Sequence, residues 1–111
     1  MPDEAQQLVN LLRSGKTEGF NQARKSLSTP SIRGADLRSV DLRGIDARDL
    51  DMRDCHLRNC DMRGLDLSSA LLDGASIGGA KISGALFPRG LTAEEVNLSL
   101  VHGTRMRVSN S

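Results

Sequence analysis

Residues 30–89 follow an uninterrupted five-residue period, which neither an α-helix nor a plain β-strand would show. Every fifth residue is apolar: Ile32, Leu37, Leu42, Ala47, Met52, Leu57, Met62, Leu67, Leu72, Ile77, Ile82 and Phe87. A second series, two positions earlier in each unit, is small or apolar: Ala35, Val40, Ile45, Leu50, Cys55, Cys60, Leu65, Ala70, Ala75, Ala80 and Ala85. Each unit therefore has two inward positions that flank one outward position, followed by two residues that must turn the chain.

The second turn position mostly holds residues that tolerate unusual backbone angles. It is occupied by Gly34, Ser39, Gly44, Asp49, Asp54, Asn59, Gly64, Ser69, Gly74, Gly79 and Gly84. The pattern predicts one straight side and one corner in every unit.

Units such as Ala35-Asp36-Leu37-Arg38-Ser39 resemble the pentapeptide-repeat family, whose consensus is Ala-(Asp/Asn)-Leu-x-x. The resemblance implies a mainly β fold, a right-handed quadrilateral β-helix of about three coils, with four units in each coil. It also suggests a cyanobacterial origin, since such proteins are especially numerous there and many have no assigned role. Because Pro30 occupies the first small inward position, we expect the first unit to be irregular.

If residues twenty apart stack, the inward residues form columns. The columns then read Leu37, Leu57, Ile77; Leu42, Met62, Ile82; and Ala47, Leu67, Phe87. Cys55 and Cys60 point inward on neighbouring sides, and without a recognisable secretion signal they are expected to be buried free thiols.

Both flanks are predicted to cover the open ends of the coils, which would otherwise invite aggregation. The alternative is that the C-terminal helix is a docking element for a partner or for a second copy. Residues 1–29 are expected to form a helical cap, residues 30–89 the repeat domain, and residues 90–111 a short helix with a tail. A first helix is expected after Asp3, with Ala5, Leu8, Val9 and Leu12 on one face and Gly15 at its end. A second helix from about Thr17 places Phe20, Ala23 and Leu27 on one side.

The C-terminal flank begins where Pro88 and Gly90 end the period. Thr92-Ala93-Glu94-Glu95 is a capping box that predicts a helix to about Val101. The segment from Thr104 to Ser111 is polar and basic and is expected to be a mobile tail.

Arginine occupies one outward position in seven successive units: Arg33, Arg38, Arg43, Arg48, Arg53, Arg58 and Arg63. The outward position two residues earlier is mostly acidic: Asp36, Asp41, Asp46, Asp51, Asp61 and Asp66. One interpretation is a solvated lattice in which the carboxylates cancel the repulsion between arginines. The other is a surface for an acidic protein or a phosphate group, which the planar guanidinium fits well. Candidate partner residues on it are Arg33, Arg38, Arg43, Arg53, Arg58 and Arg63.

The charged pattern stops after Asp66, and the last coil presents Ser, Gly and the outward Leu71 and Leu86. This smooth face is either covered by the C-terminal segment of the chain or is a protein interface, including one for a homodimer through the C-terminal coil.

The residue pattern argues against a metal or cofactor site, catalysis, nucleic-acid binding and a membrane span. Cys55 and Cys60 point inward and His56 outward, so they cannot converge on a metal ion, and no metal or cofactor is expected. No nucleophile and base occur in a catalytic arrangement, so an enzyme is not expected. The net charge of +1 and the lack of Trp and Tyr disfavour nucleic-acid binding, and no apolar run is long enough to span a membrane.

The sequence therefore predicts a cytoplasmic, non-enzymatic scaffold or adaptor that docks on a protein partner or a larger assembly. The alternative is an inhibitor or protector of DNA gyrase that mimics DNA, a role that some proteins of the resembled family have. Three short coils with equal numbers of basic and acidic residues over 30–89 make a poor copy of a uniformly negative duplex.

Overall fold

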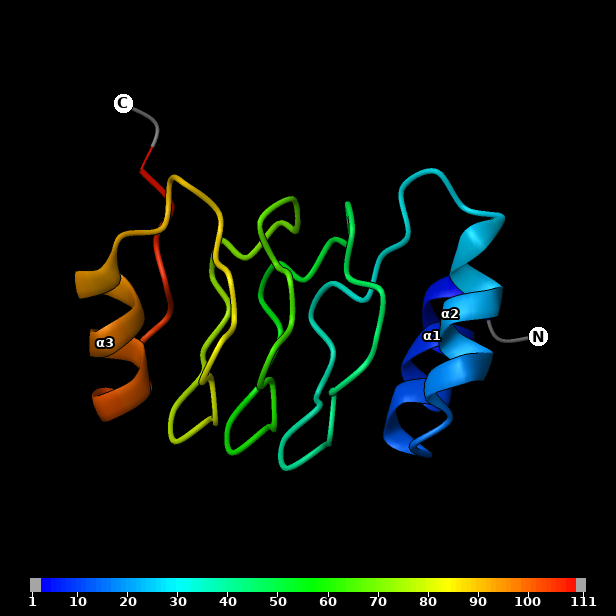
Figure 1. The fold of residues 1–111 in the computed structure, drawn as a ribbon, viewed down its shortest axis with the longest axis horizontal. Helices are drawn as coiled ribbons and strands as arrows, with labels where there is room; N and C mark the ends of the chain where they lie inside the picture. Colours follow the sequence, from blue (N-terminus) through cyan, green and yellow to red (C-terminus); the bar gives the residue numbers. More distant parts are fainter. Residues whose placement is uncertain (1–2, 110–111) are drawn as a thin grey trace.

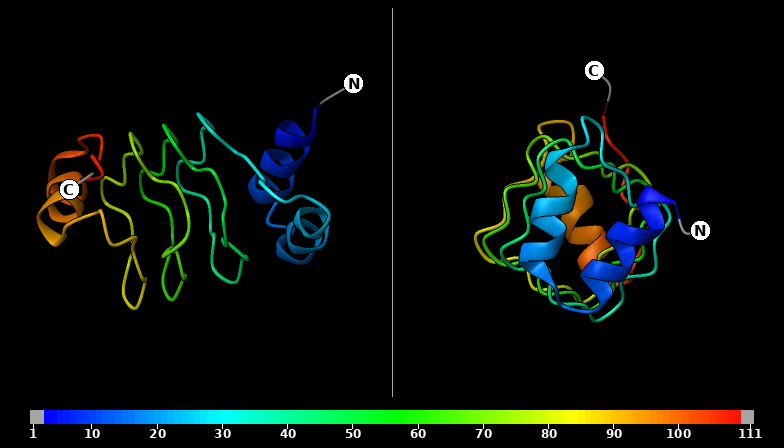
Figure 2. Two further views of the ribbon diagram at one scale, coloured as in Figure 1. Left: turned by 90° about the horizontal axis from the view of Figure 1, so that it is seen from above. Right: turned by 90° about the vertical axis from the view of Figure 1, so that its right-hand side faces the viewer.

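The computed structural model describes residues 3–109 as a column of stacked coils with helices at both ends (Figure 1). Helices α1 (Glu4–Arg13) and α2 (Thr17–Lys25) lie at one end, and α3 (Ala93–His102) lies at the other. Seen along the column in Figure 2, α1 and α2 lie across the mouth of the first coil. The molecule measures 38 × 28 × 25 Å along its principal axes.

The coils stack with the predicted spacing of twenty residues. Seven parallel bridges join residues that far apart: Ser31–Asp51, Asp36–His56, Asp41–Asp61, Asp51–Leu71, His56–Ser76, Asp61–Lys81 and Asp66–Leu86. Two-residue turns separate the sides of each coil. The five-residue period in the sequence is therefore one side and one corner of a coil, as predicted.

The predicted fold class, a mainly β right-handed quadrilateral β-helix, is wrong. Residues 3–109 contain no β-sheet, only isolated single-residue bridges, whereas the three helices hold 10, 9 and 10 residues. The reason is the shortness of each unit. Asp41 forms a bridge with Asp61 of the next coil, Leu42 points inward, and Arg43-Gly44 already turn the chain. Pairing therefore stops after one residue and never extends into a strand.

The first unit is also more regular than its sequence indicated. Ser31 bridges Asp51, and Arg33-Gly34 form the usual turn. The carbonyl of Pro30 accepts a 2.9 Å hydrogen bond from the Asp51 N–H. In other units the equivalent N–H, such as that of Ala35, closes the preceding two-residue turn; no such turn precedes Pro30, so its missing donor causes no disruption.

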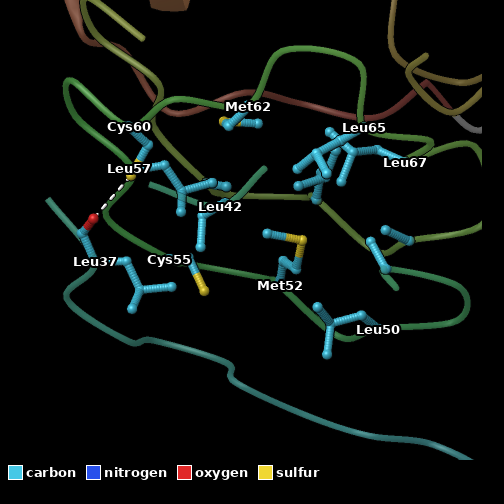
Figure 3. Packing of buried hydrophobic residues seen from close by; sticks show 14 of the residues in the cluster. Leu37, Leu42, Leu50, Met52, Cys55, Leu57, Cys60, Met62, Leu65 and Leu67 are labelled. Atoms are coloured by element: carbon cyan, nitrogen blue, oxygen red, sulfur yellow. Dashed lines mark hydrogen bonds between the residues drawn. The ribbon is translucent and has the colours of Figure 1, made fainter. Parts of the chain in front are cut away.

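The inward residues form the core between the ends, as Figure 3 shows for the middle of the column. Leu37, Leu57 and Ile77, one predicted column, are fully buried. Cys55 and Cys60 are buried free thiols, as predicted. The Cys60 thiol donates to the Leu37 carbonyl at 2.8 Å, the contact drawn as a dashed line in Figure 3.

The corner positions confirm the turn prediction with one exception. Positive φ is found at Gly34, Ser39, Gly44, Asp49, Asp54, Asn59, Gly64, Gly74, Gly79 and Gly84. Ser69 does not share it. Its hydroxyl instead accepts a 3.1 Å hydrogen bond from the Asp49 N–H of the preceding coil.

The N-terminal helices form as predicted. Asp3 caps α1 by accepting from the Gln6 N–H at 2.8 Å, and Gly15 follows the helix with φ 72°. Leu8 and Leu12 of α1 and Phe20 of α2 are almost completely buried against the core cluster.

Polar side chains of this cap satisfy the exposed edge of the first coil. Arg13 donates to the Asp36 carbonyl at 3.2 Å. The Asn21 side chain donates to the Gly44 carbonyl at 3.1 Å and accepts from the Asp46 N–H at 2.8 Å. Arg24 donates to the Asp46 carbonyl at 3.1 Å. The cap thus supplies partners that a preceding coil would have supplied.

At the other end, Thr92 caps α3 by accepting from the Glu95 N–H, and Gly103 ends the helix in the left-handed conformation, as predicted. The predicted mobile tail is wrong for Thr104–Ser109. Arg105 forms an antiparallel bridge with Ser76, and Met106 is 1% exposed. This segment orders because its backbone pairs with edge groups of the last coil; Asn110 and Ser111 lie outside the described residues.

Within residues 3–109, every helix is too short and too polar to cross a lipid bilayer.

Candidate protein-docking surfaces

The outward arginines pair with acidic residues of their own units. In five units the guanidinium makes a two-pronged contact with the Asp two residues earlier: Arg38–Asp36, Arg43–Asp41, Arg48–Asp46, Arg53–Asp51 and Arg63–Asp61. The five Nη2–Oδ2 distances lie between 2.7 and 2.9 Å. These arginines already have partners, so much of the predicted surface is internally neutralised.

The pairing holds the carboxylates in their charged form. The hydrogen bonds from Arg48 and Arg63 lower the pKa of Asp46 and Asp61, each to about 2, and burial opposes this shift. Asp61 also forms an ion pair with Arg43 of the preceding coil, whose Nε lies 3.3 Å from the carboxylate. The Asp and Arg side chains therefore carry opposite charges over the whole neutral range and cancel locally.

Two arginines depart from this pattern because their units lack the aspartate. Ser31 stands two residues before Arg33, which instead reaches Asp54 of the next coil at 3.4 Å. His56 stands two residues before Arg58, and within residues 3–109 the Arg58 side chain has no ion pair or hydrogen bond. The sequence carries this signal, since His56 breaks the Asp-x-Arg pattern, but the sequence-based prediction grouped Arg58 with the other arginines.

A groove of about 720 Å³ lies beside Arg58, between the end of α1 and the side of the first two coils. Its lining comprises Leu12, Arg13, Gly15, Asp36, Arg38, Ser39, Val40, Asp41, Arg58 and Asn59. Three arginines and two aspartates leave one positive charge in excess. We call this the Arg58 groove.

The two predicted surface leucines are exposed. Leu71 is 49% exposed and Leu86 is 58% exposed, so the C-terminal segment does not cover them. That segment lies instead over Gly74–Ser76, where Gly74 donates to the Met106 carbonyl at 2.7 Å and Met106 donates to the Ala75 carbonyl at 2.8 Å.

A second groove, of about 570 Å³, lies between α3 and the last coil. It is lined mainly by apolar side chains: Ile82, Ala85, Phe87, Leu91, Ala93, Val96, Asn97 and Leu100. Ile82 and Phe87 were predicted core residues, yet they are only half-buried because α3 and the final segment leave this corner open. We call it the C-terminal groove; the sequence pattern did not reveal it.

Unpaired backbone donors lie at the same corner. In the middle coil, Met62 and Gly64 donate to the carbonyls of Lys81 and Ser83 at 2.8 and 2.9 Å. The equivalent N–H groups of Ile82 and Gly84 have no acceptor in the part of the chain that the structure describes. This corner is therefore an open edge beside an apolar groove.

The buried thiols offer no reactive centre. Burial raises the pKa of Cys55 and Cys60 to about 11 each, so both stay protonated at neutral pH. Among residues 3–109, no group of three or more His, Cys, Asp or Glu side chains is arranged to hold a metal ion.

Comparison with known proteins identifies the repeat. A family model described as pentapeptide repeats matches residues 51–87 in eight copies. No curated protein and no solved structure matches the chain significantly. Residues 51–87 of the chain are therefore a run of pentapeptide repeats, as the sequence predicted.

Proposed function

We propose that the chain is a non-enzymatic protein-binding scaffold that takes up an extended segment of a partner protein along its C-terminal edge. The family supports the general part of this proposal, since pentapeptide-repeat proteins are generally scaffolds without catalytic activity. The unpaired N–H groups of Ile82 and Gly84 support the specific part, the uptake of an extended segment at this edge.

The main support comes from how the chain covers the neighbouring side of the same coil. There, the extended segment around Arg105 and Met106 pairs with Gly74, Ala75 and Ser76. The last coil is thus able to accept an extended chain. A partner segment that accepts hydrogen bonds from Ile82 and Gly84 would repeat this pairing, a common mode of peptide recognition.

The C-terminal groove supplies the apolar contact that such a segment needs. An apolar side chain of the partner placed against Ile82, Phe87 and Leu100 would remove exposed hydrocarbon from water, at roughly 25 cal/mol for each Å². Leu86, exposed at the same end of the column, would lie at the rim. A second copy of the chain is the competing occupant, and light scattering would reveal it as a dimer.

The gyrase alternative receives no support from the surface. A DNA mimic needs a continuous negative strip, but five outward Asp residues of the first two coils pair with arginine: Asp36, Asp41, Asp46, Asp51 and Asp61. A supercoiling assay with purified gyrase is the check: inhibition or protection at micromolar concentrations of the chain would favour the mimic over the scaffold.

The scaffold proposal is tested by capture of a partner from the native host with the tagged chain. Asn97→Arg places a long charged side chain in the wall of the C-terminal groove, and we expect it to abolish stoichiometric capture. His102→Arg is the control, because it adds an arginine to the same helix away from the groove. Equal capture by wild type and Asn97→Arg would refute docking at this edge. Failure of the wild-type chain to capture any stoichiometric partner would refute the scaffold proposal.

A further inference from the structure

The Arg58 groove differs from the rest of the charged surface in one respect. Five arginines are held by an aspartate of their own unit, whereas the guanidinium of Arg58 is exposed and unpaired within residues 3–109. The cause is a single residue, His56, in the position where an aspartate would bind it. His56 places an imidazole where the other units place a carboxylate, so Arg58 lacks an acidic partner in its own unit.

The surroundings favour a carboxylate there. Arg13 lies across the groove and uses one nitrogen to hold the Asp36 carbonyl. Asp36 and Asp41, the acidic residues of the lining, are each bound by the arginine of their own unit. Their negative charge is therefore offset locally, and the field at Arg58 is positive.

We propose that the Arg58 groove binds an acidic segment of a protein partner, with an Asp or Glu carboxylate of that segment pairing with the Arg58 guanidinium, which has no aspartate in its own unit. This inference rests on the proposed protein-binding function and gives it a second contact, at the opposite end of the column from the C-terminal groove. The arginine fork would hold the carboxylate with two hydrogen bonds, as it does in the Arg38–Asp36 pair.

The missing carboxylate can be supplied by the chain itself, which provides a sharp variant. His56→Asp restores the Asp-x-Arg pattern, so the new carboxylate should engage Arg58 and exclude an external one. His56 is exposed, and within residues 3–109 its side chain forms no hydrogen bond or ion pair, so this variant is expected to fold. Arg58→Ala removes the site directly.

The test titrates a fluorescently labelled peptide of alternating Asp and Gly into the full-length chain at low salt and follows anisotropy. We expect Arg58→Ala and His56→Asp to weaken binding at least about threefold, the scale of one well-formed ion pair. Arg63→Ala is the matched control: it removes one charge, but Arg63 is already held by Asp61, so binding should stay within about twofold of wild type.

Equal weakening by Arg58→Ala and Arg63→Ala would show that only net charge matters and would overturn the inference. Absence of peptide binding by wild type would also overturn it, as would stronger displacement of the peptide by duplex DNA than by an unlabelled acidic peptide. The scaffold proposal is judged separately, by capture from the host. A partner captured equally by wild type and Arg58→Ala, with a peptide affinity that Arg58→Ala leaves unchanged, would refute the groove and leave the scaffold standing.

Discussion

Arg24 of α2 and Asp46 of the first coil are joined twice, since one guanidinium nitrogen donates to both the backbone carbonyl and the carboxylate of Asp46 at 3.1 Å. The same nitrogen donates to the Arg48 carbonyl at 2.6 Å. Arg24 is only 7% exposed. This one side chain therefore fastens the helical cap to a coil edge that would otherwise lack partners.

Loss of Arg24 should destabilise the whole chain. Arg24→Ala leaves two carbonyls at the edge without their donor, and we expect the free energy of unfolding to fall by about 2 kcal/mol. Arg48→Ala is the control because Arg48 forms an exposed pair with the same aspartate, so it should lower the free energy of unfolding far less than Arg24→Ala does. Urea unfolding followed by circular dichroism measures both, and similar losses would contradict this role for Arg24.

Ser99 closes the opposite end in a comparable way. It is fully buried, its hydroxyl accepts from the Ile77 N–H at 3.0 Å, and it donates to the Thr104 carbonyl at 2.5 Å. Ser99→Ala should cost about 1–3 kcal/mol, because a buried donor and acceptor lose their partner. Ser83→Ala, on an exposed turn, should cost almost nothing. Faster hydrogen exchange at Ile77 in Ser99→Ala would confirm the local cause, and unchanged exchange would contradict it.

The Asp–Arg pairs predict a specific acid sensitivity. Folding lowers the pKa of Asp46 and Asp61 from 3.8 to about 2, so their contribution to stability is complete above pH 3.8 and is lost as the pH falls toward 2. The free energy of unfolding should therefore be nearly constant from neutral pH to about 4 and then decline. Urea unfolding at a series of pH values tests this. Carbon NMR titration of the two carboxyl groups would contradict the account if their midpoints lay near 4.

The thiols should be inert in the native chain. Burial raises the pKa of Cys55 and Cys60 to about 11, and their S–H groups bond to the carbonyls of Ile32 and Leu37. A disulfide reagent at pH 8 should label neither thiol in native buffer and both in urea. Rapid labelling without denaturant would show that the coils open more readily than this packing allows.

Much of the arrangement was predictable from the five-residue period. A strict repeat forces equivalent residues to stack, so the columns through Leu37 and Leu57, the buried cysteines and the capping helices followed from residue type alone. The fold class did not, because alternation within a unit predicts strand, whereas the corner after Leu42 limits pairing to a single residue. The period predicts which residues point inward, but it does not predict over how many residues the backbones of neighbouring coils pair.

The candidate surfaces were less predictable because they arise where the repeat ends or fails. The open corner at Ile82 depends on which sides α3 and Met106 happen to cover, a tertiary outcome without a local signal. The unpaired state of Arg58 within residues 3–109 stands out only against the internal pairing of the other arginines, which was expected only as a general cancellation of charge. His56 was the one local sign of it.

The central claim is that an extended partner segment pairs with the open edge at Ile82 and Gly84. Amide hydrogen exchange of the chain, alone and with its captured partner, tests this most directly, with Gly64 as an internal reference that is already bonded. The account predicts that the Ile82 and Gly84 amides exchange fast alone and become protected in the complex, while Gly64 changes little. Fast exchange of both amides in a saturated complex would contradict it.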